Sequence, residues 1–257
     1  MTIRVGRVPH LSFEPFYVDM ERRGLQLIDT PLRDLTNALE RGELDAGPVP
    51  LVDSFRLEEG FLPVAGFCLA VGSKAGSTFL YSKVPVQELA GTRIGLDHED
   101  STSVTLLKVL LSEKYNLQPD GYVTPKEPCD AFVITGDPAL RRRRGVRGYP
   151  YKYDLGAEWH EWTDLPFVFA RWVFRKDMDL KDAALLEDTL YVGLEEGVDS
   201  LYHLAEPRDN LLMLARDIVE YVMGFRYFIG LSEQKAIDRF RHHFEKLEQE
   251  SRPARAS

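Results

Sequence analysis

Short apolar segments alternate with helical patterns over the first fifty residues. Residues 3–8, 25–28 and 44–46 read as strands, and residues 31–41 read as an amphipathic helix between the second and third of them. Residues 47–50, Gly-Pro-Val-Pro, read as a rigid loop. A chain that alternates strands with helices predicts a parallel or mixed sheet covered by helices.

The same alternation continues further along the chain, and the last third is helical. Further strands are expected at residues 62–71, 78–82, 93–96 and 131–134, and helices at 183–204, 208–223 and 232–248. Residues 167–174 form a long apolar run that could cross from one lobe to another. No low-complexity linker or internal repeat separates these elements, so we expect a two-lobed α/β fold with a cleft.

The charge balance limits the class of partner. The chain has 41 acidic and 32 basic residues, a formal net charge of -9, which argues against a nucleic-acid partner. A cleft can still be locally positive and bind a small anion. The two cysteines, Cys68 and Cys129, have neither metal-ligand nor disulfide spacing.

The N-terminus lacks the apolar region of a secretory signal, and no apolar stretch reaches the roughly 18–20 residues of a membrane span. A cytoplasmic location without a membrane partner is therefore expected. The sequence leaves open whether the protein is a monomer or a dimer.

The turn Asp100-Ser101-Thr102-Ser103 combines hydroxyl side chains with the free N–H groups of a helix start. A helix N-terminus attracts anions through these donors and through the helix dipole. Ordinary capping explains the same residues, although one serine or threonine would suffice for it. Either an anion site or a capped helix is therefore expected here.

Loops at strand ends are further candidates. Residues 47–50 and 76–78 lie where ligands bind in α/β sheets, although turn chemistry alone also explains them. Asp137 follows Gly136 at the end of a strand. Because a bare carboxylate repels an anion, Asp137 is expected to fix a neighbouring loop rather than to bind one.

Two basic features have a structural and a functional interpretation. His10 precedes the first turn and could act as an acid, a base or a hydrogen-bond donor, or could be purely structural. The run Arg141–Arg144 is typical of a solvated face, with a lid or an anion-guiding patch as the alternative. The chain contains no G-x-S-x-G, P-loop, G-x-G-x-x-G or H-E-x-x-H motif, so no cofactor or metal is expected.

Several segments together resemble a known family in their order and spacing. They are Val5–Arg7, Leu11–Pro15, Gly42–Val49, Ser77 with Ser82–Pro85, Ser101–Leu107, Gly136–Leu140, Asp154–Trp159, Thr163–Trp172 and Phe225–Tyr227. The pattern resembles the chorismate dehydratases of menaquinone biosynthesis, in the futalosine pathway. The resemblance covers nearly the whole chain, and the order of the segments is more specific than any one of them.

The resemblance implies an α/β fold of the periplasmic-binding-protein type II kind. Each of its two lobes would carry a mixed sheet flanked by helices, with the cleft between the lobes. Lobe 1 would comprise residues 1–83 and 172–257 and lobe 2 residues 84–171, joined by two crossing strands. Residues 249–257 read as a frayed tail.

The resemblance also implies a lyase that converts chorismate into 3-(1-carboxyvinyloxy)benzoate by loss of water, without a cofactor. Thr102 and Ser103 would hold one substrate carboxylate, and Ser77 with the loop at Val49 would hold the other or the ring. The substrate's own side-chain carboxylate would take the proton, so the site would need only to orient the substrate and stabilise charge. The expected substrate-binding residues are Val49, Pro50, Ser77, Thr78, Thr102, Ser103, Gly136 and Asp137.

One position departs from the family pattern. The family's opening turn usually carries an asparagine that is regarded as important for catalysis, and Ser12 stands at that position here. Serine has a shorter reach and lacks the second group of the amide. Ser12 and His10 are therefore the expected catalytic positions, with His10 or a water compensating for the shorter side chain.

Two other functions remain open. A 1,4-dihydroxy-6-naphthoate synthase-like enzyme of the same pathway would share the fold, but the Ser-Pro-Asn-Asp opening expected of it is absent from residues 7–16. A non-catalytic cytoplasmic protein that binds a small anion is the alternative from another class.

Overall fold

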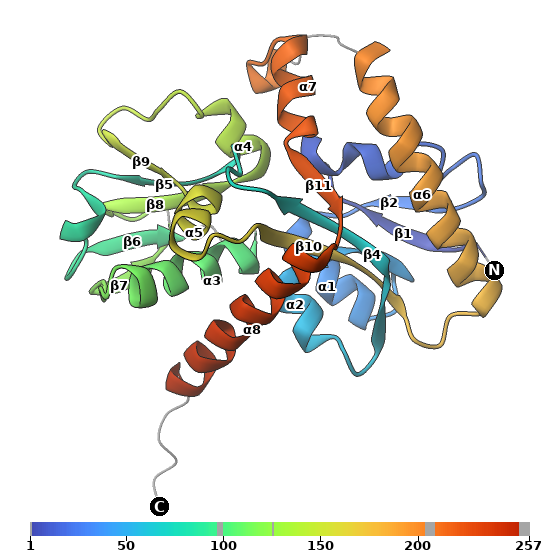
Figure 1. The fold of residues 1–257 in the computed structure, drawn as a ribbon, viewed down its shortest axis with the longest axis horizontal. Helices are drawn as coiled ribbons and strands as arrows, with labels where there is room; N and C mark the ends of the chain where they lie inside the picture. Colours follow the sequence, from blue (N-terminus) through green and yellow to red (C-terminus); the bar gives the residue numbers. More distant parts are fainter. Residues whose placement is uncertain (1, 97–99, 125, 204–208, 252–257) are drawn as a thin grey trace, which may run out of the picture.

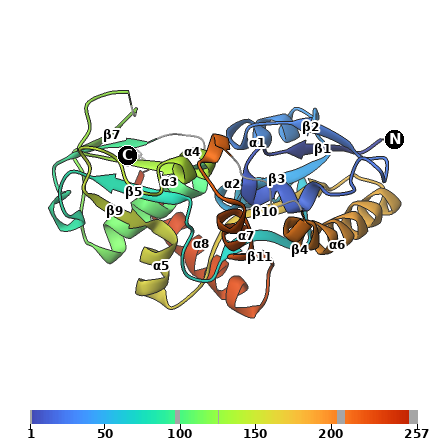
Figure 2. The same cartoon turned by 90° about the horizontal axis from the view of Figure 1, so that it is seen from above.

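The chain folds into two lobes, each built on its own sheet (Figure 1). The structure is a computed structural model that describes residues 2–96, 100–124, 126–203 and 209–251. Figure 2 shows the same two lobes from above, with α7 and α8 near their junction. The expected two-lobed α/β architecture is therefore confirmed.

The first lobe contains the sheet with strand order β11-β4-β10-β3-β1-β2. Its strands are β1 (Arg4–Arg7), β2 (Gln26–Asp29), β3 (Ala46–Pro50), β4 (Phe61–Val71), β10 (Phe167–Arg175) and β11 (Phe225–Phe228). Its helices are η1 (Leu11–Tyr17), α1 (Leu32–Glu40), α2 (Leu51–Arg56), α6 (Leu180–His203), η4 (Asp209–Leu211), α7 (Ala215–Met223) and α8 (Leu231–Ser251). Strand β1 pairs in parallel with β2 and β3, whereas β10 runs antiparallel to β3 and β4, so the sheet is mixed.

The second lobe contains the sheet with strand order β7-β6-β8-β5-β9. Its strands are β5 (Thr78–Ser82), β6 (Arg93–Leu96), β7 (Gly121–Val123), β8 (Ala131–Thr135) and β9 (Tyr151–Asp154). Its helices are η2 (Val86–Glu88), α3 (Ser101–Val109), η3 (Leu110–Lys114), α4 (Gly136–Arg141) and α5 (Leu155–Thr163). Strand β6 is parallel to β7 and β8, and β5 is antiparallel to β8 and β9, so this sheet is mixed as well.

Sheet membership moves both lobe boundaries away from the expected positions. Strand β5 pairs with β8 and β9, so the second lobe begins before residue 78 rather than at 84. Strand β10 pairs with β3 and β4, so the chain re-enters the first lobe before residue 167 rather than at 172. The run 167–174 therefore lies within one sheet, and the chain crosses between lobes at residues 72–77 and 164–166.

Residues 47–50 form a strand rather than the expected rigid loop. They continue β3, and their partners on β10 run from Val173 back to Ala170. Pairing of β3 with β1 is confined to Ala46. Pro48 and Pro50 have no backbone N–H group to donate to a neighbouring strand, which is consistent with this limited pairing.

The C-terminal helices also differ from the expected ranges. Helix α7 begins at Ala215 rather than at 208, and α8 continues to Ser251 rather than ending at 248. Part of the expected frayed tail, residues 249–251, is therefore helical, and residues 252–257 lie outside the described residues. In the described part of the chain, no helix is both long and apolar enough to span a lipid bilayer.

The first crossing is fixed to the second lobe by one carboxylate. Asp154 caps α5 by accepting a hydrogen bond from Ala157 N (3.1 Å), and it also accepts from Ala75 N (2.9 Å) and Gly76 N (2.7 Å). A Cβ atom on Gly156 would lie 2.9 Å from Ala75 N, so the close approach requires glycine. The segment that leads to Ser77 is thereby held in place.

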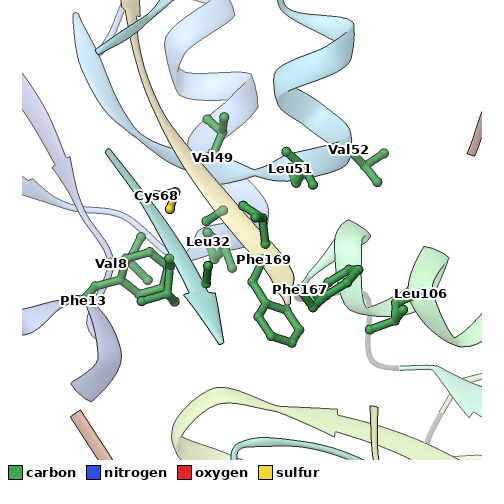
Figure 3. Close-up of a cluster of buried hydrophobic side chains, with 14 of the residues drawn as sticks. Val8, Phe13, Leu32, Val49, Leu51, Val52, Cys68, Leu106, Phe167 and Phe169 are labelled. Carbon is green, nitrogen blue, oxygen red and sulfur yellow. The ribbon is translucent and has the colours of Figure 1, made fainter. Parts of the chain in front are cut away.

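The hydrophobic core is continuous between the lobes at their base. Phe167 on β10 lies beside Leu106 of α3, as Figure 3 shows. Phe167 is also packed edge-on against Trp159 of α5, with ring centroids 5.4 Å apart. Because Phe167, Trp159 and Leu106 are at most 1 % exposed, separating the lobes here would expose large apolar surfaces.

Helix α6 packs directly on the backbone of the opening turn, η1. A Cβ atom on Gly193 would lie 2.7 Å from Val18 O, and one on Gly197 would lie 2.6 Å from Pro15 O. Both distances are shorter than any side chain can accept, so the two glycines determine how closely α6 approaches η1.

We predict that Gly197→Ala destabilises the protein by about 1–3 kcal/mol, because the added methyl group must displace backbone. Urea unfolding monitored by circular dichroism would measure the change. Gly121→Ala is the matched control, since a Cβ atom there meets no atom within 4 Å. Equal stability of the two variants would show that the close α6 contact is not required.

Candidate functional site

A small cavity of about 30 Å³ lies at the junction of the lobes. It is lined by His10, Ser12, Phe13, Leu32, Leu69, Ser77, Thr78, Asp100, Thr135, Gly136, Phe169, Ala170 and Phe225. Hydroxyl groups, one imidazole and one carboxylate face an otherwise apolar wall. The volume has room for about two water molecules, so the lobes must move apart before a larger ligand enters.

His10 packs across the junction onto Gly136. His10 is the residue that precedes η1, and Gly136 begins α4 in the other lobe with a φ of +66°. A Cβ atom on Gly136 would lie 2.6 Å from ring atoms of His10, so this position requires glycine for both conformation and space. The two expected site residues therefore meet at the cavity.

Asp137 fixes the opening turn from the second lobe. Its Oδ1 accepts a hydrogen bond from Leu11 N at 3.1 Å. Asp137 is not among the residues that line the cavity. This geometry matches the interpretation of Asp137 as a residue that fixes a loop, rather than its assignment to substrate binding.

Tyr221 is hydrogen-bonded to a serine that lines the cavity. Its hydroxyl donates to Ser77 Oγ at 2.7 Å. Burial raises the pKa of Tyr221 far above that of a free phenol, although the bond to Ser77 opposes this shift. The phenol therefore keeps its proton at physiological pH.

A second pair of hydroxyls lies on the second-lobe side of the cavity. Thr78 Oγ1 and Thr135 Oγ1 are 3.1 Å apart across the antiparallel pair β5 and β8. Gly136 N donates to Ser77 O at 2.8 Å, which keeps the ends of these strands together. Ser77, Thr78 and Gly136, which the sequence predicts as site residues, thus share one edge of the cavity.

The predicted carboxylate clamp at the start of α3 is occupied by the protein itself. Asp100 Oδ1 accepts from Thr102 N at 2.9 Å, and Asp100 Oδ2 accepts from the Ser103 hydroxyl. Thr102 Oγ1 accepts from Val52 N at 3.2 Å, a contact between the lobes. Thr102 N and the Ser103 hydroxyl thus cap the helix, and of this turn only Asp100 lines the cavity. The assignment of Thr102 and Ser103 to substrate binding stays a prediction.

Val49 and Pro50 also lie away from the cavity. Both are buried in β3, and Figure 3 shows Val49 within the hydrophobic core. Neither lines the cavity, because residues 47–50 pair with β10 instead of forming a loop at its edge. Their predicted contact with substrate has no counterpart in this arrangement.

The arginine run is mainly exposed, with one exception. Arg141, Arg142 and Arg144 are exposed, as expected of a solvated face. Arg143 donates to the carbonyl oxygens of Leu211 (3.2 Å) and Leu212 (2.7 Å), which belong to the other lobe. Arg143 therefore holds the lobes together at the outer edge of the junction.

Among the described residues, no group of three or more His, Cys, Asp and Glu side chains is arranged to hold a metal ion. The polar side chains that line the described cavity are hydroxyls, the His10 imidazole and the Asp100 carboxylate.

Residues 3–246 match the profile of a protein family described as menaquinone biosynthesis. The chain belongs to this family. Among curated proteins, a chorismate dehydratase of Thermus thermophilus is 24% identical over 256 residues, which cover 92% of this chain and 93% of that protein. Membership in a biosynthetic family supports an enzymatic function.

Solved structures show the fold that the family shares with binding proteins. Protein AF1704 from Archaeoglobus fulgidus matches with a TM-score of 0.71 at 14% identity, covering 96% of this chain and 98% of that one. The periplasmic aliphatic sulphonate binding protein of Escherichia coli matches with a TM-score of 0.60 at 15% identity, covering 96% and 88%. The expected periplasmic-binding-protein fold is thus confirmed in this member of the menaquinone biosynthesis family.

The buried carboxyl group of Asp100 makes stability depend on pH. Burial raises its pKa from 3.8 to about 6, against the opposing effect of hydrogen bonds from Ser103 and Thr102. The ionised carboxylate therefore lowers the free energy of unfolding above about pH 6. This destabilisation disappears as the pH falls toward 3.8.

We predict that lowering the pH from 7.5 to 4.5 raises the free energy of unfolding of the wild type relative to Asp100→Asn by about 2 kcal/mol. Urea titrations at both pH values measure this difference. Asp34→Asn, an exposed position on α1, is the control and should show no comparable change. A difference between wild type and Asp100→Asn that does not vary with pH would contradict the prediction.

Proposed function

We propose that this member of the menaquinone biosynthesis family is a chorismate dehydratase, a lyase that forms 3-(1-carboxyvinyloxy)benzoate and water. The observation that carries the proposal is the cavity at the lobe junction, where Ser12, Ser77 and Thr78 face an apolar wall that includes Phe169. Chorismate has matching chemistry, because its ring is apolar while its substituents are a hydroxyl and two carboxylates. The named Thermus thermophilus relative supports the same reaction.

The reaction needs little from the protein beyond orientation. The ring carbon next to the hydroxyl-bearing carbon loses a proton, and the C–O bond then breaks with its electron pair leaving on oxygen. The proton and the hydroxide together make one water, and the ring becomes aromatic, which drives the reaction. Hydroxyl donors that stabilise charge on the departing oxygen are sufficient, with the substrate's side-chain carboxylate as the proton acceptor.

The charges at the cavity orient the substrate in this proposal. The Asp100 carboxylate would repel a substrate carboxylate placed at the start of α3. We therefore place the substrate's carboxylates toward His10 and the hydroxyls of Thr78 and Thr135, away from Asp100. The His10 imidazole can donate a hydrogen bond to a carboxylate there. We propose that the reaction takes place in the cytoplasm and without a cofactor.

We predict that the purified protein converts chorismate into a product lighter by one water, detected by mass spectrometry. Ser77→Ala should lower kcat/KM by roughly 100-fold, because it removes a hydroxyl at the cavity. Ser112→Ala is the control, since Ser112 bonds only weakly to Val109 O, at 3.4 Å in η3. Binding of chorismate without turnover would favour a non-catalytic binding protein, and no binding would contradict the proposed site.

A further inference from the structure

Tyr221 contacts one of the cavity serines from behind. Ser77 ends the first crossing and Tyr221 lies on α7, so two distant segments meet at this pair of hydroxyls. Ser77 lines the cavity and is 6 % exposed. Tyr221 borders instead an outer hollow that also contains Arg143 and Asp217.

The direction of this bond leaves the Ser77 hydrogen for another acceptor. Each of the two hydroxyls has one hydrogen to donate. Because Tyr221 donates to Ser77, the phenol does not use the Ser77 hydrogen. That hydrogen faces Ala75 O at a long 3.5 Å, and it can turn toward a ligand.

We propose that Tyr221 is a positioning residue that aligns Ser77 so that its hydroxyl donates to the oxygen that leaves the substrate. This inference rests on the proposed dehydration. As the ring C–O bond breaks, its electron pair moves onto that oxygen, and the serine hydrogen bond stabilises the growing charge. The proton that completes the water comes from the neighbouring ring carbon, so neither Ser77 nor Tyr221 is consumed.

The geometry favours this role over simple packing. The Tyr221 ring already packs edge-on against Phe225, with centroids 5.0 Å apart, so the aromatic contact does not need the hydroxyl. The hydroxyl is instead hydrogen-bonded to Ser77, which lines the cavity. Substitution by phenylalanine therefore removes the alignment while it keeps the packing.

Tyr221→Phe should lower kcat for chorismate roughly 10- to 100-fold with little change in KM, because misaligned donors affect the reacting geometry more than ground-state binding. Tyr227→Phe is the matched control. Its hydroxyl donates to Val222 O at 3.3 Å and its ring packs on Phe16, but its hydroxyl is not bonded to Ser77. It should retain wild-type kcat.

A double-mutant cycle separates alignment from general destabilisation. If Tyr221 acts through Ser77, Ser77→Ala combined with Tyr221→Phe should lose little more kcat than the more severe single variant. Unchanged kcat in Tyr221→Phe, or equal losses in Tyr221→Phe and Tyr227→Phe, would overturn the positioning role while the dehydratase proposal stands. Absence of turnover in the wild type would overturn both.

Discussion

The opening turn, η1, is held from two sides, and the rest of the site depends on this. On one side α6 approaches so closely that a Cβ atom on Gly197 would lie 2.6 Å from Pro15 O. On the other side Asp137 of the second lobe accepts a hydrogen bond from Leu11 N. His10 and Ser12 flank that N–H group in sequence, so the contact that joins the lobes also sets both residues at the cavity.

The start of α3 shows why a helix N-terminus alone does not identify a ligand site. Its donors bind anions, but here the anion is the Asp100 side chain. The remaining polar groups that line the cavity are hydroxyls, backbone and the His10 imidazole. Neutral donors suit an elimination that is driven by aromatisation, because the protein must orient the substrate rather than supply a strong acid and a strong base.

Local patterns predicted much of the fold, since periodicity reports burial. The strand at 61–71 and the long helix α6 follow from that signal. The prediction of a loop at residues 47–50 was wrong. Proline and glycine are typical of loops, and only pairing with β10 makes this segment a strand. Ser12 and Ser77 could be predicted as site residues, because both lie in segments that match the family pattern. Tyr221 carries no such signal, because only the packing of α7 brings its hydroxyl to Ser77.

A crystal structure of the protein grown with chorismate tests the central claim most directly, because it shows both where the ligand binds and what it has become. The account predicts an aromatic product between the lobes, in contact with Ser12 and Ser77, with the lobes further apart than a cavity of about 30 Å³ allows. Unreacted chorismate bound outside this junction, with the junction unchanged, would contradict it.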